Sequence, residues 1–171
     1  MNDDAHHILL FGVRRSIRYH RRRRGFFERT DQTINVCVLL LSFASAASAG
    51  QNLILATFTL GASIAVLTIL QIACRFSAKI SVHSSLERAF SKLEQELVEN
   101  EDDETVLRVN EKRLLLDADE PPVKRYVDVM CHNELVRALG YADEHRWNLK
   151  WWQKVIAPFS DFGFDEFRKQ A

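Results

Sequence analysis

The residues best able to do chemistry in this 171-residue chain are arginines near its start. Residues 1–30 contain eight arginines against three acidic residues. Guanidinium groups bind phosphate through paired hydrogen bonds, and beside a membrane they are attracted to anionic lipid by roughly 1 kcal/mol each. Arginines that flank a membrane span need no further ligand to explain them. The candidate contacts for a nucleotide phosphate or for lipid are Arg18, Arg21, Arg22, Arg23 and Arg24.

The other reactive side chains form no catalytic pattern. Serines and histidines are scattered, with no nucleophile elbow, phosphate-binding loop or carboxylate pair in apolar surroundings. Cys131, His132 and His145 are too sparse for a zinc site, and the acidic run 99–104 lacks the glycine and spacing of a calcium loop. We therefore expect no enzymatic activity, no metal and no cofactor.

Charge is balanced overall but strongly segregated. The chain has 23 basic and 23 acidic residues, yet residues 94–120 carry eleven acids against three basic residues. The acidic block and the arginine-rich start either pair with each other or face different partners.

The middle of the chain has no charge at all. Residues 32–74 contain no Asp, Glu, Lys, Arg or His, and the turn-forming run 49–52 divides them. Each half is about 20 residues long, which at ~1.5 Å per residue matches a hydrocarbon core of ~30 Å. The pattern predicts a transmembrane helical hairpin with spans at roughly 33–49 and 53–74.

Flanking charges predict the orientation of this hairpin. Arginines precede the first span, Arg75, Lys79 and Arg88 follow the second, and the turn between them is uncharged. By the positive-inside rule, both termini are cytoplasmic. We expect a multi-pass membrane protein.

Polar residues recur along both spans at helical spacing. They either let the helices pack closely or line a water-filled pore, which needs several hairpins in a ring because a lone hairpin encloses no channel. The candidate pore-lining residues are Asn35, Ser42 and Ser45 in the first span, and Thr57, Gly61, Thr68 and Gln71 in the second.

Beyond the membrane, the second helix is expected to continue past Arg75, since no Pro or Gly follows before Pro121. A heptad stripe lies on it and offers an oligomer contact, or packs against the N-terminal helix of the same chain. This stripe comprises Leu86, Phe90, Leu93 and Leu97.

The last third of the chain suggests shorter helices. Residues 105–117 are a helix or a strand, Pro121-Pro122 is a break, and helices are expected at 123–139 and 143–156. Aromatic residues at the end either fill a small core or lie at a membrane surface. They are Trp147, Trp151 and Trp152, followed by Phe159, Phe162, Phe164 and Phe167, of which the phenylalanines should dock on something.

The predicted fold is an all-α membrane protein: a two-helix transmembrane hairpin with long cytoplasmic helical extensions and a small C-terminal helical region. Its parts are an Arg-rich cytoplasmic helix (1–31), the hairpin (32–74), a cytoplasmic helix continuing the second span (75–104) and a C-terminal cytoplasmic helical region (105–171).

The layout resembles the SLATT family, two-transmembrane effectors associated with nucleotide-signalling defence systems of bacteria. The resemblance covers about residues 14 to 98. The residues that carry it are Tyr19-His20, Arg21–Arg24 and Phe26-Phe27-Glu28-Arg29 before the spans, and Phe76-Ser77-Ala78-Lys79, His83, Leu86 and Phe90, Leu93 and Glu94 after them. His132-Asn133-Glu134-Leu135-Val136-Arg137-Ala138-Leu139-Gly140 is also similar to a distal helix of some members.

The resemblance implies an oligomeric, pore-forming effector of antiviral defence, located in the bacterial inner membrane. A nucleotide or oligonucleotide signal from a partner nucleotidyltransferase would control a homo-oligomer, with a tetramer as the expected assembly, and cause depolarisation or growth arrest. The alternative is a membrane scaffold that recruits a soluble partner through its acidic and aromatic C-terminal segment and forms no pore.

Overall fold

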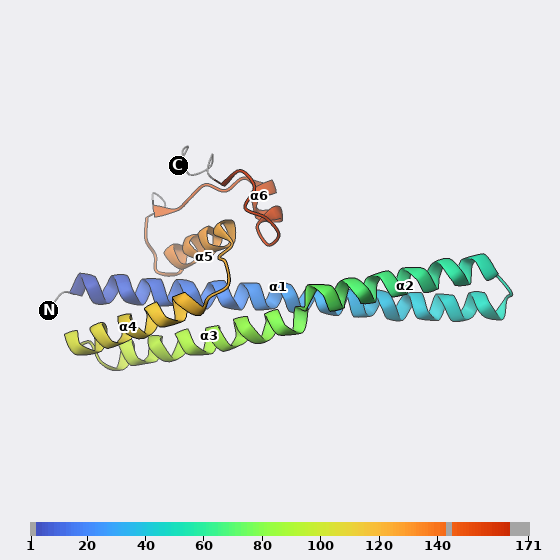
Figure 1. Ribbon diagram of the computed structural model, residues 1–171. Coiled ribbons are helices and arrows are strands. Elements are labelled where there is room, and N and C mark those ends of the chain that lie inside the picture. The colour runs from blue at the N-terminus through green and yellow to red at the C-terminus, as the bar shows by residue number, and fades with distance from the viewer. Residues whose placement is uncertain (1–2, 143–144, 165–171) are drawn as a thin grey trace. The chain divides into compact units, whose positions relative to one another are not determined.

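The computed structural model describes residues 3–142 and 145–164. These residues form helices and contain no strand, which confirms the all-α prediction (Figure 1). The helices are α1 (Asp3–Gly50), α2 (Ile54–Cys74), α3 (Phe76–Glu99), α4 (Asp103–Asp119), α5 (Arg125–Ala138) and α6 (Trp151–Ile156).

The chain divides into two compact units. The hairpin unit comprises Arg24–Val82, and the helical unit comprises Met1–Arg23 with His83–Ala171. Helices α1 and α3 each contribute residues to both units, so the chain passes from one unit to the other once along each of these helices.

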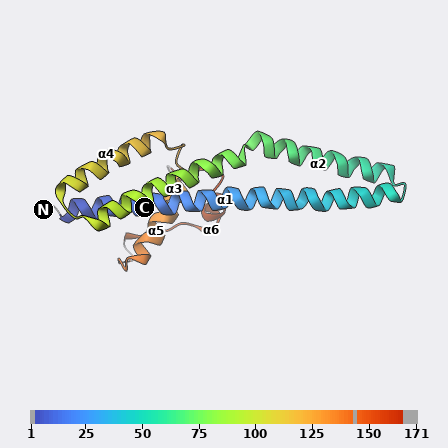
Figure 2. The ribbon, with the colours of Figure 1, turned by 90° about the horizontal axis from the view of Figure 1, so that it is seen from below.

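The hairpin unit contains the rest of α1 and, antiparallel to it, α2 (Figure 2). The chain reverses at Gln51 and Asn52, where the predicted break lies, and Asn52 adopts a left-handed φ of 59°. Asparagine tolerates this conformation better than most residues. Both helices are long and apolar enough to cross a membrane, and the most apolar stretch of each contains no fully buried residue.

A seam of half-buried side chains joins the two helices of the hairpin. Its positions follow each other at intervals of three and four, as expected for one face of a helix. They are Ile34, Val38, Leu41, Ser45 and Ser48 on α1, and Thr57, Leu60, Ile64, Leu67, Gln71 and Cys74 on α2.

The helix that was predicted to continue past Arg75 is interrupted at that residue. Helix α2 ends at Cys74 and α3 begins at Phe76, with Arg75 between them at a left-handed φ of 49°. The Arg75 N–H donates to the Ile72 carbonyl at 3.2 Å and closes the last turn of α2. This cap is usually made by glycine, so nothing in the local sequence announces it.

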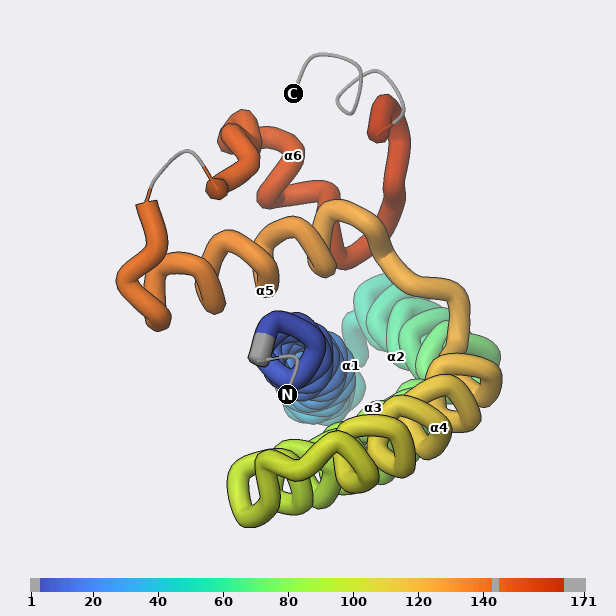
Figure 3. The backbone as a smooth tube through the Cα atoms, turned by 90° about the vertical axis from the view of Figure 1, so that its left-hand side faces the viewer, coloured from blue at the N-terminus to red at the C-terminus, as the bar shows by residue number. Residues whose placement is uncertain are grey.

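In the helical unit, the start of α1 lies between α5 on one side and α3 and α4 on the other (Figure 3). The heptad stripe of α3 is buried here, and its side chains pack on the N-terminal helix of the same chain. The core they form consists of Leu86, Phe90, Leu93 and Leu97 with Leu9, Val13, Ile17 and Val109.

The ends of α4 and α5 follow local capping rules. Residues 105–117 belong to a helix, because Asp102 caps α4 by accepting a 2.8 Å hydrogen bond from the Thr105 N–H. Helix α4 ends at Asp119, before the Pro121-Pro122 break. Gly140 follows α5 at φ 73°, in the left-handed conformation for which glycine is suited.

Among the described residues, the helix predicted at 143–156 is wrong in its first half and confirmed in its second. Residues 147–150 have no regular secondary structure, and the helix begins only at Trp151. The Asn133 side chain holds the backbone of Trp147, since its Nδ2 donates to the Trp147 carbonyl at 2.7 Å and its Oδ1 accepts from the Trp147 N–H at 2.9 Å.

The aromatic residues of this region divide into two groups. Phe164 packs edge to face on Tyr126, with ring centroids 5.1 Å apart. Trp152 is half-buried, and the exposed group comprises Trp147, Trp151, Phe159 and Phe162. The small core beneath them is made by other residues, including Tyr126, Val127, Cys131, Leu149 and Ala157. Phe167 lies outside the described residues.

Candidate functional site

The arginines predicted to contact phosphate or lipid have partners within the chain. Arg21 Nε lies 2.9 Å from Glu87 Oε1, joining α1 to α3. Arg22 Nη2 lies 3.1 Å from Glu134 Oε2, joining α1 to α5. Part of the basic block therefore pairs with acids inside the helical unit.

The other three behave similarly. Arg23 is only 8% exposed and donates from Nη1 to the Pro158 carbonyl at 2.7 Å. Burial lowers the pKa of Arg23. Arg18 donates to the Arg14 carbonyl at 3.4 Å, and in the hairpin unit Arg24 pairs with Glu28 at 3.4 Å.

A buried histidine pair lies beside these arginines. His20 on α1 and His83 on α3 are 0% and 5% exposed, with their Nδ1 atoms 3.0 Å apart. The His20 ring stacks on Phe90 at 5.5 Å. Burial, with repulsion from His20 and Arg23, lowers the pKa of His83 to about 4. His83 is thus neutral at physiological pH. A single proton between the two Nδ1 atoms is enough to form the hydrogen bond that joins the rings.

Tyr19 fixes the connection between α4 and α5 to α1. Its hydroxyl accepts a 2.9 Å hydrogen bond from the Lys124 N–H, and burial raises the pKa of Tyr19 to about 12. Glu120, in the same connection, places Oε1 3.0 Å from His20 Nε2. The pair is close, although its angles do not make a regular hydrogen bond.

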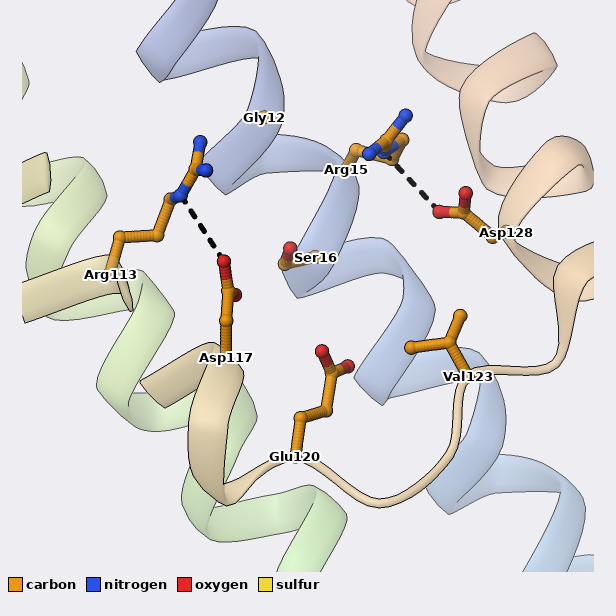
Figure 4. A pocket seen from close by; sticks show the side chains of 8 residues that line it. All are labelled: Gly12, Arg15, Ser16, Arg113, Asp117, Glu120, Val123 and Asp128. Atoms are coloured by element: carbon orange, nitrogen blue, oxygen red, sulfur yellow. Dashed lines mark ion pairs between the residues drawn. The ribbon is translucent and has the colours of Figure 1, made fainter. Parts of the chain in front are cut away.

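Glu120 also lines a charged cavity of about 280 Å³ between α1, α4 and α5. Figure 4 shows the Glu120 carboxylate between two ion pairs. Arg113 Nε lies 3.4 Å from Asp117 Oδ2, and Arg15 Nε lies 3.3 Å from Asp128 Oδ1. Burial raises the pKa of both aspartates, and the positive charge of the paired arginine opposes this rise in each case.

Gly12 provides room for one of these arginines. A Cβ at this position would come within 3.4 Å of Arg113 Nη1, closer than most Cβ contacts. Gly12 therefore lets α4 approach α1 with Arg113 lying over the helix.

Two further hollows continue from the charged cavity along α1 and α5. The first, of about 640 Å³, shares Arg15 and Asp128 with the cavity and extends to His132. The second, of about 450 Å³, shares His132 and is almost entirely apolar. Its walls are mainly rings and aliphatic groups, namely His7, Ile8, Phe11, His132, Val136, Tyr141 and His145. We call the three hollows together the α1–α5 groove.

Hydrogen bonds within the apolar end engage one ring nitrogen each of His7 and His132. His7 Nε2 is bonded to the Tyr141 hydroxyl, and His132 Nε2 bonds the His145 carbonyl at 3.0 Å. The Phe11 and His132 rings meet edge to face at 5.4 Å. One end of the groove thus offers ring surfaces and the other offers guanidinium groups.

The candidate pore-lining residues divide between two places in the hairpin. Ser45, Thr57 and Gln71 lie in the seam, where the Ser45 hydroxyl approaches the Thr57 carbonyl at 3.5 Å. The others, Asn35, Ser42, Gly61 and Thr68, are exposed. The Ser42 and Thr68 hydroxyls bond carbonyls four residues earlier, at 2.7 and 2.9 Å.

The four exposed residues share one side of the hairpin. Successive residues turn by about 100°, so Asn35 and Ser42 lie about a quarter turn beyond the centre of the α1 seam. Gly61 and Thr68 likewise lie about a quarter turn beyond the centre of the α2 seam. Because the helices are antiparallel, equal offsets bring both pairs to the same side, which we call the polar face. By the same geometry, the exposed hydroxyls of Thr59 and Ser63 lie on the opposite side.

A polar cluster lies where the hairpin opens. Gln71 Nε2 donates to Asp31 Oδ1 at 2.7 Å and to Asn35 Oδ1 at 3.0 Å. Asp31, the acidic residue that adjoins the charge-free stretch on α1, is therefore hydrogen-bonded to a side chain of α2. Asn35 connects this cluster to the polar face.

Within residues 3–142 and 145–164, no three His, Cys, Asp or Glu side chains gather as a metal site. Comparisons with protein-family models, curated proteins and solved structures find no significant match. The resemblance to the SLATT family stays a prediction from the sequence.

Sequence reasoning missed the histidine pair and the groove. His20 and His83 entered only as part of a family resemblance, because 63 positions separate them and neither has a ligand-like neighbour in sequence. Arg15 belongs to the basic block but was not distinguished from it. Its partner Asp128 lies on a helix that no local pattern pairs with α1.

Proposed function

We propose that this chain is a homo-oligomeric membrane effector whose hairpins line an ion-conducting pore, controlled by a nucleotide or oligonucleotide. It would act at the bacterial inner membrane with both termini in the cytoplasm, in antiviral defence, where a nucleotidyltransferase makes the signal. The observation that carries the pore is the polar face of Asn35, Ser42, Gly61 and Thr68 on a hairpin whose exposed surface is mainly apolar.

The exposed surface of the hairpin supports its insertion. Large apolar side chains such as Leu40, Phe43 and Phe58 are exposed along both helices, and water would oppose this arrangement. The hydroxyls of Ser42 and Thr68 are satisfied by their own helix, so lipid or another hairpin can cover them without leaving a buried polar group unpaired.

The polar face supports assembly around a pore. In lipid, polar and small residues gather where helices meet or where water enters. Ser45, Thr57 and Gln71 already occupy the seam within one hairpin, so packing inside the monomer accounts for these three. The four residues of the polar face are left for contact with water in a ring of hairpins.

The α1–α5 groove supports control by a nucleotide. Aromatic and imidazole rings at the apolar end suit a base, because any base presents a flat ring for stacking. Arg15 at the charged end suits a phosphate. The acids of the cavity outnumber its arginines, so a phosphate must take Arg15 from Asp128 in order to bind.

The histidine pair supports a route for the response. Displacement of Asp128 would disturb the cavity that holds Glu120, and Glu120 faces His20. His20 is bonded to His83, the residue at which α3 leaves the hairpin unit. A ligand in the groove would act on the two helices that run covalently into the hairpin.

The test of the pore compares substitutions on the two sides of the hairpin. We expect Ser42→Trp and Thr68→Trp to lower single-channel conductance at least twofold in planar bilayers, because each bulky ring narrows the lumen. The matched variants Ser63→Trp and Thr59→Trp, on the opposite side, should conduct like the unmodified chain. Equal conductance of all four variants would remove the polar face from the pore.

The membrane scaffold is the second candidate, and the exposed aromatic residues near the C-terminus favour it. It predicts no conductance and a soluble partner lost when residues 121–171 are deleted. A conducting chain that retains its ion flux without any partner would exclude it.

A further inference from the structure

We propose that residues 145–162 form a second membrane contact, in which an aromatic patch lies at the surface of an anionic bilayer. The patch consists of Trp151, Val155, Phe159 and Phe162, bordered by Lys150 and Lys154. The inference rests on the proposed membrane anchoring of the hairpin, but not on the existence of a pore.

The patch is unusually exposed for its composition. Trp151 is 77% exposed and Phe162 is 78% exposed, and Val155 and Phe159 are also largely exposed. Trp151 and Val155 are four residues apart on α6 and therefore share one side of it, and Phe159 lies in the turn that follows the helix. An apolar group of this size on a soluble surface marks an interaction site.

The structure holds the patch outward. Helix α6 packs on α5 (Figure 3), and its inner side contributes the buried residues Gln153 and Ala157. Gln153 Oε1 accepts from the Lys150 N–H at 2.7 Å, and Arg23 binds the Pro158 carbonyl at 2.7 Å. These bonds leave the aromatic side of α6 facing away from the core.

Charge identifies lipid as the occupant. Residues 145–162 contain three basic residues, Arg146, Lys150 and Lys154, and one acidic residue, Asp161, whose Oδ1 accepts a 3.4 Å hydrogen bond from the Tyr126 N–H. Tryptophan prefers the interface between hydrocarbon and water, and each basic residue near an anionic surface raises affinity about fivefold. By contrast, the exposed Leu107 of α4 lies between Glu104 and Glu111, which an anionic membrane would repel.

The attachment of the patch to α1 also favours lipid. Arg23, which holds Pro158, precedes the charge-free stretch at Gln32 by only nine residues. The proposed span therefore tethers the patch to a bilayer, and its lysines need only moderate affinity to keep it there.

The tryptophans provide a direct test, because all three in the chain lie at 147–152. The full chain is reconstituted into vesicles of phosphatidylcholine alone or of seven parts phosphatidylcholine to three parts phosphatidylglycerol, each with brominated acyl chains as quenchers. We expect at least twofold stronger quenching of tryptophan emission in the anionic vesicles. Lys150→Gln with Lys154→Gln should reduce it to the level in phosphatidylcholine.

Two controls separate the proposal from a general effect of mutation. Phe162→Ser should also weaken quenching, whereas Leu107→Gln, at an equally exposed apolar position among acids, should leave it unchanged. Carbonate washing before each reading retains only inserted chains.

Other results overturn the proposal. If the chains are inserted but their tryptophans are quenched by acrylamide in the water and not by the brominated lipid, the patch lies in water. Inserted chains shielded from both quenchers would show a protein contact, including a second copy of this chain. Loss of the chain on carbonate washing would contradict the anchoring itself, and with it the proposed function.

Discussion

At the scale of single residues, a few polar side chains join segments that are distant in sequence. Arg23 binds the Pro158 carbonyl across 135 positions, and Tyr19 binds the Lys124 N–H across 105. Both side chains are buried. A buried polar group that loses its hydrogen-bond partner lowers stability by about 1–3 kcal/mol. These two side chains therefore contribute strongly to the tertiary arrangement.

His83 makes the helical unit sensitive to pH. An unfolded imidazole takes up a proton near pH 6.5, whereas folded His83 does so only near a pKa of about 4. Between these values the unfolded state binds more protons, so stability falls as the pH falls through this range. Above pH 6.5 both states are neutral and the stabilisation is complete.

Thermal melts of the detergent-solubilised chain, followed by tryptophan emission between pH 7.5 and pH 4, measure this effect. His83→Leu should show a shallower loss of stability with falling pH than the unmodified chain, because the variant has no imidazole to protonate in the unfolded state. The two chains share all their carboxylates, so these cancel in the comparison. Equal slopes would show that protonation of His83 is not linked to unfolding.

At the scale of elements, the packing of α3 on α1 stabilises the helical unit. Phe90 is fully buried in the core that the two helices share with α4. We expect Phe90→Ala to lower the free energy of unfolding by about 3–5 kcal/mol, because it leaves a cavity between tightly packed helices.

Urea unfolding of the chain in detergent would measure this loss. Val98→Ala provides the comparison, since Val98 lies on the same helix but is 57% exposed, and its effect should stay within about 0.5 kcal/mol. Similar effects for both variants would place the stabilising contacts elsewhere.

Elements were predictable from sequence wherever a local signal existed. The turn near Asn52, the α3 stripe from Leu86 to Leu97 and the break at Pro121 each rest on neighbouring residues or a repeating interval. The break at Arg75 was not predictable, because a left-handed arginine has no signature. The same holds for the irregular segment at Trp147, whose backbone is bonded to an amide of Asn133 fourteen residues away.

The candidate sites show the same limit. The polar residues of the spans could be recognised from sequence, but their division between seam and polar face depends on which side of α1 meets α2. The arginines could be recognised as anion-binding groups, but their partners Glu87, Glu134 and Asp128 lie on other helices. Tertiary contact, rather than composition, determines which of these charges face a cavity.

At the scale of the whole molecule, the chain consists of an apolar helical hairpin and a helical unit with a groove. The two units are covalently connected through α1 and α3. Polar side chains on one side of the hairpin suit a pore, and rings and guanidinium groups along the groove suit a nucleotide. The central claim is that ligand binding in the helical unit changes ion flow through assembled hairpins.

Potassium flux from vesicles that hold the purified full chain tests this claim most directly, with and without a mixture of short oligonucleotides. We predict flux above that of protein-free vesicles in one of the two conditions, a clear change on addition of the mixture, and a weaker change for Arg15→Gln. The account would be contradicted if the chain resists carbonate washing, and is therefore inserted, but its vesicles lose potassium no faster than protein-free vesicles in either condition.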